Sequence, residues 1–123
     1  MANPAARRTD PDCLFCKIVA GDIPATVVRE DEATFAFRDL EPQAPTHVLV
    51  IPRHHTPNVG SLAHEAPEDA VAVLDAVHAV AEQEGIADGG YRTVFNTGAD
   101  AQQTVFHAHI HVLGGRPMTW PPG

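Results

Sequence analysis

The sequence predicts an α+β fold, in which an antiparallel sheet of about five strands is accompanied by two helices. Two observations support this class. The chain has 123 residues, which fits one compact domain with a modest core. The expected elements follow one another in the order α, β, β, β, α, β, β, so several neighbouring strands have no helix between them. That order favours antiparallel pairing over a doubly wound sheet, which needs helical crossovers.

The first half of the chain contributes a helix and three strands. A short helix is expected over residues 13–20, and a glycine ends it. Residues 27–30 and 34–38 are expected to form a strand pair across a short acidic turn. Residues 47–51 read His-Val-Leu-Val-Ile, which predicts a strongly apolar strand that Pro52 closes.

The second half contributes a long helix and two strands. Residues 53–66 are expected to be a loop. A helix is then expected from Pro67 to about Glu84, because proline suits the first helical position and two acidic residues follow it. Its apolar stripe consists of Ala70, Val73, Leu74, Val77 and Ala81. Strands over residues 91–96 and 105–113 complete the expected sheet.

Composition excludes some classes of partner. The chain has 8 Lys and Arg against 16 Asp and Glu, a net charge of −8. A nucleic-acid polymer needs a basic surface, so it is not expected, although backbone amides and imidazolium can still hold a small phosphate ester. No apolar run reaches 18 residues, so no membrane span is expected. Residues 1–11 lack the apolar stretch of a secretory signal, and we expect a disordered tail on a cytoplasmic protein whose single domain is residues 12–123.

The most informative segment is residues 107–111, His-Ala-His-Ile-His. Side chains alternate between the two faces of a strand, so His107, His109 and His111 are expected on one face. The apolar residues between and beside them are expected to pack on the core. Imidazoles titrate near neutral pH, so the histidine face is suited to acid–base or nucleophilic chemistry.

The spacing of this histidine row limits its chemistry. A strand advances about 3.3 Å per residue, so neighbouring histidines are roughly 6.5 Å apart and the outer two roughly 13 Å. Zinc–nitrogen bonds are about 2.1 Å long, so three such histidines do not bind one metal in a regular strand. A neutral imidazole that attacks phosphorus, helped by a second imidazole, fits better. The central His109 is the expected nucleophile. A polar solvent-facing strand and a metal-binding pair are the alternatives.

The histidine segment resembles the signature of the histidine-triad superfamily. The resemblance is carried by residues 103–115, and the Trp-Pro-Pro-Gly ending at residues 120–123 is similar to the Hint branch in particular. Upstream, Gly-Asp-Ile-Pro at residues 21–24 and Asp-Leu-Glu-Pro-Gln-Ala-Pro-Thr-His at residues 39–47 resemble the same branch. The resemblance therefore covers about residues 12–123.

This resemblance implies a nucleoside phosphoramidase that acts on adenosine 5′-monophosphate linked to an amine. His109 would take up the nucleotidyl group, and His111 would contact the phosphate. Thr104 stands where the family usually has Ser, beside the phosphate oxygens. In zinc-free relatives, His47 and His107 belong to a hydrogen-bond relay to the nucleophile. The family also implies a homodimer whose two sheets join across the interface, a purine nucleotide substrate and no catalytic metal.

The resemblance further implies a nucleotide pocket. Asp39 matches the carboxylate that holds the ribose hydroxyls, and Asn96 matches a polar residue of the phosphate pocket. Trp120 matches a C-terminal residue that nears the partner's active site. The apolar slot for the base would consist of Phe15, Ile18, Ile23, Phe37 and Leu40. Without the family, the apolar residues are equally typical of a core, and Asp39 and Asn96 of turns.

Cys13 and Cys16 are spaced as C-x-x-C. By itself this spacing is typical of a redox pair, half of a metal site, or two inert thiols. Many Hint proteins lack these cysteines, whereas some bacterial triad proteins carry them together with two histidines. The resemblance then implies a structural zinc held by Cys13, Cys16, His47 and His107. His54 and His55 are expected to be surface or boundary residues.

The leading hypothesis is hydrolysis of the P–N bond of purine nucleoside 5′-phosphoramidates through a covalent nucleotidyl-histidine. A dinucleoside polyphosphate hydrolase of a sister branch is one alternative, although the Trp-Pro-Pro-Gly ending argues against it. A nucleotide-binding or protein-interaction module with incidental hydrolysis is a second alternative. A zinc hydrolase that uses the histidine row is a third.

Overall fold

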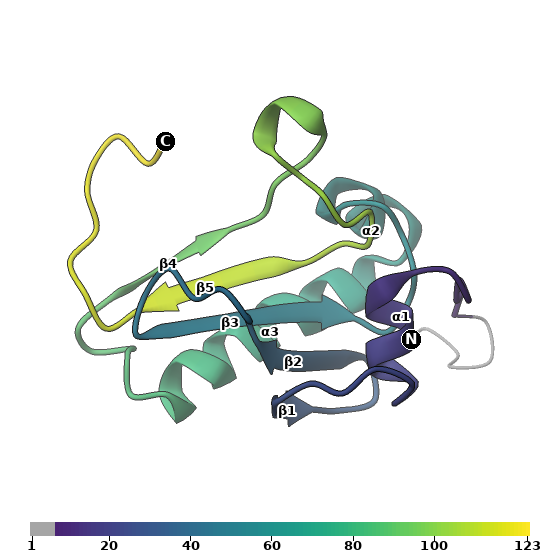
Figure 1. Ribbon diagram of the computed structural model, residues 1–123, viewed down its shortest axis with the longest axis horizontal. Helices are drawn as coiled ribbons and strands as arrows, with labels where there is room; N and C mark the ends of the chain where they lie inside the picture. The colour runs from purple at the N-terminus through teal and green to yellow at the C-terminus, as the bar shows by residue number, and fades with distance from the viewer. Residues whose placement is uncertain (1–6) are drawn as a thin grey trace.

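The computed structural model describes residues 7–123 (Figure 1). In chain order its elements are α1 (Leu14–Val19), β1 (Val27–Glu30), β2 (Thr34–Arg38), β3 (Thr46–Pro52), α2 (Val59–Glu65), α3 (Pro67–Gln83), β4 (Tyr91–Val94), the 3-10 helix η2 (Ala99–Ala101) and β5 (Ile110–Gly114). The α+β class and the five-stranded antiparallel sheet are confirmed.

The five strands form one sheet in the order β1-β2-β3-β5-β4, and every neighbouring pair is antiparallel. A row of paired residues crosses its middle, in which Phe37 pairs with Leu49 and Leu49 pairs with His111. On the other side of β5, His111 pairs with Val94. Hydrogen-bonded neighbours on both sides therefore hold the backbone of His111.

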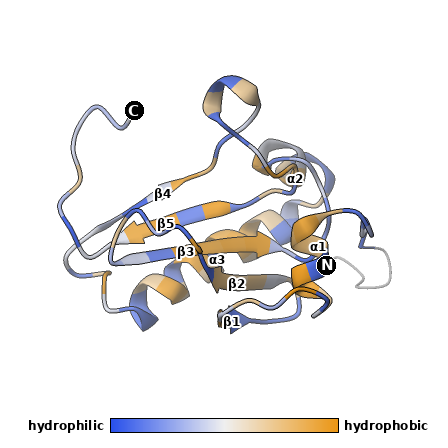
Figure 2. Ribbon diagram, viewed as in Figure 1, coloured by the Kyte–Doolittle hydropathy of each residue, from blue (hydrophilic) through white to orange (hydrophobic). Residues whose placement is uncertain are grey.

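Both faces of the sheet are covered. Val48 and Val50 of β3 belong to the core beneath α3, whereas the alternating residues Leu49 and Ile51 pack with Phe15 of α1. Because successive strand residues point to opposite faces, α3 and α1 lie on opposite sides of the sheet. Burial on both sides explains why β3 is apolar along most of its length, as Figure 2 shows.

The helices differ from expectation in two respects. The loop predicted over residues 53–66 contains α2, which the Asn58 side chain caps by accepting a hydrogen bond from the Ser61 N–H at 2.8 Å. Within residues 7–123, three α-helices are therefore present instead of the two expected. On α3, Leu74 is 59% exposed, so its predicted place in the apolar stripe is wrong. The buried apolar face of α3 consists of Val73, Ala76, Val77, Val80 and Ala81.

The final strand is shorter than predicted. β5 begins at Ile110, so His107 and His109 lie in the segment before it. β3 ends at Pro52, and the Ala108 N–H instead donates to the Thr56 carbonyl at 2.8 Å. The predicted alternation still brings Ala108, Ile110 and Val112 into the α3-side core, whereas Phe106 is exposed.

The expected tail, residues 1–11, lies partly outside the described residues. From Arg7 onward the chain packs against the domain, because Arg7 pairs with Asp69 of α3 and Arg8 with Glu65 of α2. Within residues 7–123, none of the helices has the length and apolar character needed to cross a membrane.

Candidate active site and metal cluster

A cleft of about 420 Å³ lies on the α1 side of the sheet. Its polar lining includes Asp39, Thr104, His109 and His111. All five apolar residues expected to form a base slot also line this cleft, and they are Phe15, Ile18, Ile23, Phe37 and Leu40. The cleft therefore has an apolar lining together with the imidazoles of His109 and His111, the carboxylate of Asp39 and the hydroxyl of Thr104.

The His109 ring is held in one orientation by the backbone. Its Nδ1 lies 2.7 Å from the carbonyl oxygen of His107. A carbonyl only accepts, so Nδ1 carries the hydrogen and donates it, which leaves the lone pair of neutral His109 on Nε2. The Phe15 ring packs edge-on against His109 with centroids 5.2 Å apart. His109 therefore offers a fixed basic nitrogen in the cleft.

A chain of hydrogen bonds orients His111. The Gln43 backbone N–H donates to Nδ1 of His47 at 3.0 Å, so neutral His47 carries its hydrogen on Nε2. That Nε2 lies 2.9 Å from Nδ1 of His111, and 3.4 Å from a carboxylate oxygen of Asp39. His111 therefore accepts at Nδ1 and presents its own N–H at Nε2, as a hydrogen-bond donor.

Burial keeps these imidazoles neutral at physiological pH. It lowers the pKa of His111 to about 4, and the neighbouring His109 and His47 add to that effect. Burial also lowers the pKa of His109 and of His47 below their usual range. Imidazoles that stay unprotonated at neutral pH suit a nucleophile at His109 and a neutral donor at His111.

A second group of side chains lies beside the cleft and consists of Cys13, Cys16, His55 and His107. The ring nitrogen Nδ1 of His107 lies 3.4 Å from the Cys13 sulfur and 3.6 Å from the Cys16 sulfur. Nδ1 of His55 lies 3.6 Å from the Cys16 sulfur and 3.2 Å from Nδ1 of His107. The four potential ligand atoms all lie within 4.8 Å of one another.

These distances fit a tetrahedral zinc site. Zinc–sulfur bonds of about 2.3 Å and zinc–nitrogen bonds of about 2.05 Å place a sulfur and a nitrogen about 3.5 Å apart, and two nitrogens about 3.3 Å apart. The Nε2–H of His107 donates to the Pro52 carbonyl at 2.8 Å, which leaves the Nδ1 lone pair directed at the thiols. Burial lowers the pKa of His107 to about 4, so the ring is an unprotonated ligand at neutral pH.

The structure brings together three of the four residues expected to hold zinc. Cys13, Cys16 and His107 lie in one group, whereas His47 lies with His111 and Asp39. The fourth side chain of the group is His55, which was expected to be a surface or boundary residue. His47 is at the opposite end of β3 from Pro52, and the cluster forms just beyond the Pro52 end. The sequence signal for His55 was its position three residues after Pro52, which ends β3. The His107 ring contacts the Pro52 carbonyl, so the segment before β5 passes close to this point.

Two expected site residues lie elsewhere. Asn96 and Trp120 are not among the residues that line the cleft. Trp120 is 81% exposed, and the Arg92 guanidinium lies over its ring, 6.0 Å from the centroid.

Gln103, for which the sequence predicted no individual role, supports the histidine segment. Its buried side chain donates to the carbonyls of Pro57 and Val105 and accepts from the Gly98 N–H. Gln103 therefore ties the loop before His107 to the loop that carries α2.

Known proteins match this chain over most of its length. A family model described as HIT domain matches residues 20–118. The 14 kDa zinc-binding protein of Zea mays is 46% identical over 119 residues, which are 95% of this chain and 92% of that protein. The purine nucleoside phosphoramidase of Escherichia coli (strain K12) is 42% identical over 107 residues, 87% of this chain and 90% of that protein. A solved structure, the HIT family hydrolase from Legionella pneumophila Philadelphia 1, superposes with a TM-score of 0.87 at 49% identity and covers 91% of this chain and 100% of that chain.

Proposed function

The chain belongs to the HIT family, and from that premise we propose that it hydrolyses the P–N bond of purine nucleoside 5′-phosphoramidates through a nucleotidyl-histidine intermediate. The observation that carries this proposal is the 2.7 Å hydrogen bond from Nδ1 of His109 to the His107 carbonyl. It leaves a neutral, oriented Nε2 in a cleft that also carries His111 and Thr104. The named activity of the E. coli relative supports the same chemistry.

The substrate is expected to lie with its base against the apolar wall and its phosphate at the histidines. Asp39, which lines the cleft, is expected to accept from the ribose hydroxyls. Each carboxylate oxygen has two lone-pair directions, and its present partners, the Glu41 N–H and His47, use only part of them. The Thr104 hydroxyl and the Nε2–H of His111 are expected to donate to phosphate oxygens. Positioning and charge stabilisation then supply most of the rate.

The reaction proceeds in two displacements. Nε2 of His109 attacks phosphorus, a bond from nitrogen to phosphorus forms, and the bond from phosphorus to the substrate amine breaks. The leaving amine takes up one proton from solvent. The oxygen of a water molecule then bonds to phosphorus and the bond from phosphorus to Nε2 breaks, which releases the nucleoside monophosphate, returns a proton to solvent and restores the Nε2 lone pair. The net reaction consumes one water and yields the free amine and the monophosphate.

We further propose that Cys13, Cys16, His55 and His107 bind a structural zinc. When bound, the metal would neutralise two thiolates and fix four side chains in place, with no free position for substrate. The zinc-binding name of the maize relative supports this assignment. Zinc binding would affect catalysis through His107. The ring of His107 belongs to the cluster, and its carbonyl oxygen accepts the hydrogen bond that orients His109.

A homodimer in the cytoplasm is the expected form of the protein. β4 lies at the edge of the sheet, where a second copy can extend it, and Trp120 is exposed. Asn96 and Trp120 would then belong to a site completed by the dimer. Sedimentation velocity tests this assembly, and a monomer at micromolar concentration would contradict it.

The proposed reaction is tested by release of AMP from adenosine 5′-phosphoramidate. We expect turnover by the native protein, loss of at least about a thousandfold in His109→Ala, and full activity in His78→Ala, whose imidazole is exposed on α3. A dinucleoside tetraphosphate serves as the competing substrate. Preference for the tetraphosphate would support the sister-branch hydrolase, and tight AMP binding with no turnover of either compound would support a binding module.

Loss of turnover on zinc removal with recovery on zinc return, while His109→Ala stays active, would support a zinc hydrolase. Each of these three outcomes would overturn the phosphoramidase proposal.

A further inference from the structure

The segment of residues 7–12, the N-terminal strap, contacts two of the four residues of the cluster, His55 and Cys13. The Arg8 carbonyl accepts from the His55 N–H at 2.8 Å, and the Asp10 carbonyl accepts from the Cys13 N–H at 3.1 Å. A carboxylate oxygen of Asp10 lies 3.8 Å from Nε2 of His55. Carboxylates placed behind a metal-binding histidine orient the ring and strengthen it as a ligand.

The strap is tied to the helices by its two arginines. Arg7 approaches Asp69 with two nitrogens, Nε at 3.2 Å and Nη2 at 3.1 Å, and the side chains are only 8% and 3% exposed. Arg8 pairs with Glu65 at 2.8 Å in a more exposed position. A buried pair of this kind is sensitive to loss of one partner, because the remaining charge then has to move out to solvent. We call the Arg7–Asp69 pair the latch.

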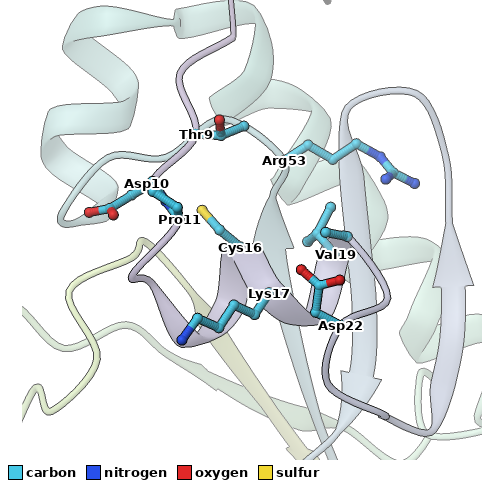
Figure 3. A pocket seen from close by; sticks show the side chains of 9 residues that line it. Thr9, Asp10, Pro11, Cys16, Lys17, Val19, Asp22 and Arg53 are labelled. Carbon is cyan, nitrogen blue, oxygen red and sulfur yellow. The ribbon is translucent and has the colours of Figure 1, made fainter.

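The strap also forms one wall of the approach to Cys16. A pocket of about 290 Å³ lies between the strap and α1, and Figure 3 shows the Cys16 sulfur beside Thr9, Asp10 and Pro11 at its edge. A docked strap therefore covers one side of a potential metal ligand.

We propose that docking of the N-terminal strap and binding of zinc at the four-residue cluster are coupled, and that the Arg7–Asp69 latch sets the strength of that coupling. The inference rests on the zinc proposed above. Coupling of this kind is reciprocal: if the docked strap tightens zinc binding, bound zinc stabilises the docked strap by the same factor. Neither latch residue is a ligand or lines the cleft.

The first test measures zinc affinity of the full chain by competition with a chromogenic chelator. Native protein is expected to bind one zinc. Asp69→Asn and Arg7→Gln are expected to bind it about 10-fold more weakly, the lower end of the range found when direct outer partners of metal ligands are removed, because the latch acts on the ligands only through the strap. Arg38→Gln is the matched control, because it breaks a two-bond pair with Glu84 that does not involve the strap, and its zinc affinity is expected to be unchanged.

The second test measures the reverse effect with trypsin, which cuts after Arg7 and Arg8. We expect cleavage at these sites to be at least about tenfold faster in zinc-free protein than in zinc-loaded protein, and fast in both forms of Asp69→Asn, which keeps both arginines. Mass spectrometry of the shortened chain locates the cut. This readout does not depend on catalytic activity, so it separates the coupling from the phosphoramidase reaction.

The outcomes are distinct. Native protein that binds no zinc would overturn the metal site and the coupling together. Native protein that binds zinc, with both latch variants as tight as Arg38→Gln, would overturn the coupling and leave the metal site standing. Equal cleavage rates with and without zinc would likewise overturn it. Weakened zinc binding in the two latch variants alone would support it.

Discussion

Exchanging His47 and His55 in turn for alanine separates two roles, hydrogen bonding to His111 and zinc binding. The sequence analysis had considered both roles for His47. The geometry assigns His47 to the hydrogen-bond chain behind His111, and His55 to the metal cluster. His47→Ala is therefore expected to keep bound zinc and lose activity. His55→Ala is expected to lose zinc affinity, because only three of the four ligands remain.

The size of the His47 effect follows from its contacts. The side chain is 5% exposed and lies 2.9 Å from Nδ1 of His111. Its removal leaves the Nδ1 acceptor of His111 without a donor in a buried site, which costs about 1–3 kcal/mol. If this cost falls on the transition state, kcat/KM falls about 5- to 150-fold. His47→Gln places an amide N–H near the same position, and we expect it to restore part of the activity.

The assay combines kcat/KM for adenosine 5′-phosphoramidate at pH 7 with zinc content by atomic emission. Circular dichroism confirms that each variant is folded. The reasoning is refuted if folded His47→Ala retains activity within twofold of native protein. It is also refuted if His47→Ala loses zinc while His55→Ala keeps it, which would restore the ligand set expected from the sequence.

Three further predictions follow from the same contacts. Because burial lowers the pKa of His109 below 6.5, the nucleophile stays neutral as the pH falls, and the acid limb of kcat/KM is expected below pH 6.5. The rate of uncatalysed hydrolysis is subtracted at each pH. A midpoint of the acid limb at or above pH 6.5 would contradict this prediction. Thr104→Val is expected to lower kcat/KM about 10- to 150-fold through loss of a hydroxyl that donates to a charged phosphate, whereas Thr104→Ser keeps the hydroxyl and stays within about threefold; equal activity of the two variants would remove that role. Ile110→Ala is expected to lower the free energy of unfolding by about 2–5 kcal/mol in urea, because Ile110 is 1% exposed beneath α3, and Val71→Ala, at an exposed position of α3, provides the comparison.

The sheet was accessible from sequence because its strands have simple patterns. The segments predicted over residues 27–30 and 34–38 coincide with β1 and β2. The apolar run at residues 47–51 predicted a strand that coincides with most of β3, and the proline at the start of α3 marked that helix correctly. The α2 helix was missed because Pro57 and Gly60 suggest a loop, and its single buried residue, Leu62, gives no periodic signal.

Alternation placed the histidines only in part. It identified Ala108, Ile110 and Val112 as core residues, but the strand begins too late to include His107 and His109. The orientation of His109 depends on a bond to the backbone carbonyl two residues earlier, which no periodicity predicts. Whether His47 or His55 lies beside Cys13, Cys16 and His107 depends on which end of β3 is close to His107. The register between β3 and β5 sets that end.

The most direct test of the account is to trap the nucleotidyl-enzyme. Native protein is mixed with adenosine 5′-phosphoramidate, denatured within milliseconds, digested and analysed by mass spectrometry. The account predicts one adenylyl group on the peptide that contains residues 107–111, with fragmentation that assigns it to His109 and no modified peptide in His109→Ala. An adenylyl group on a different residue, or rapid AMP release with no modified peptide at any quench time, would contradict it.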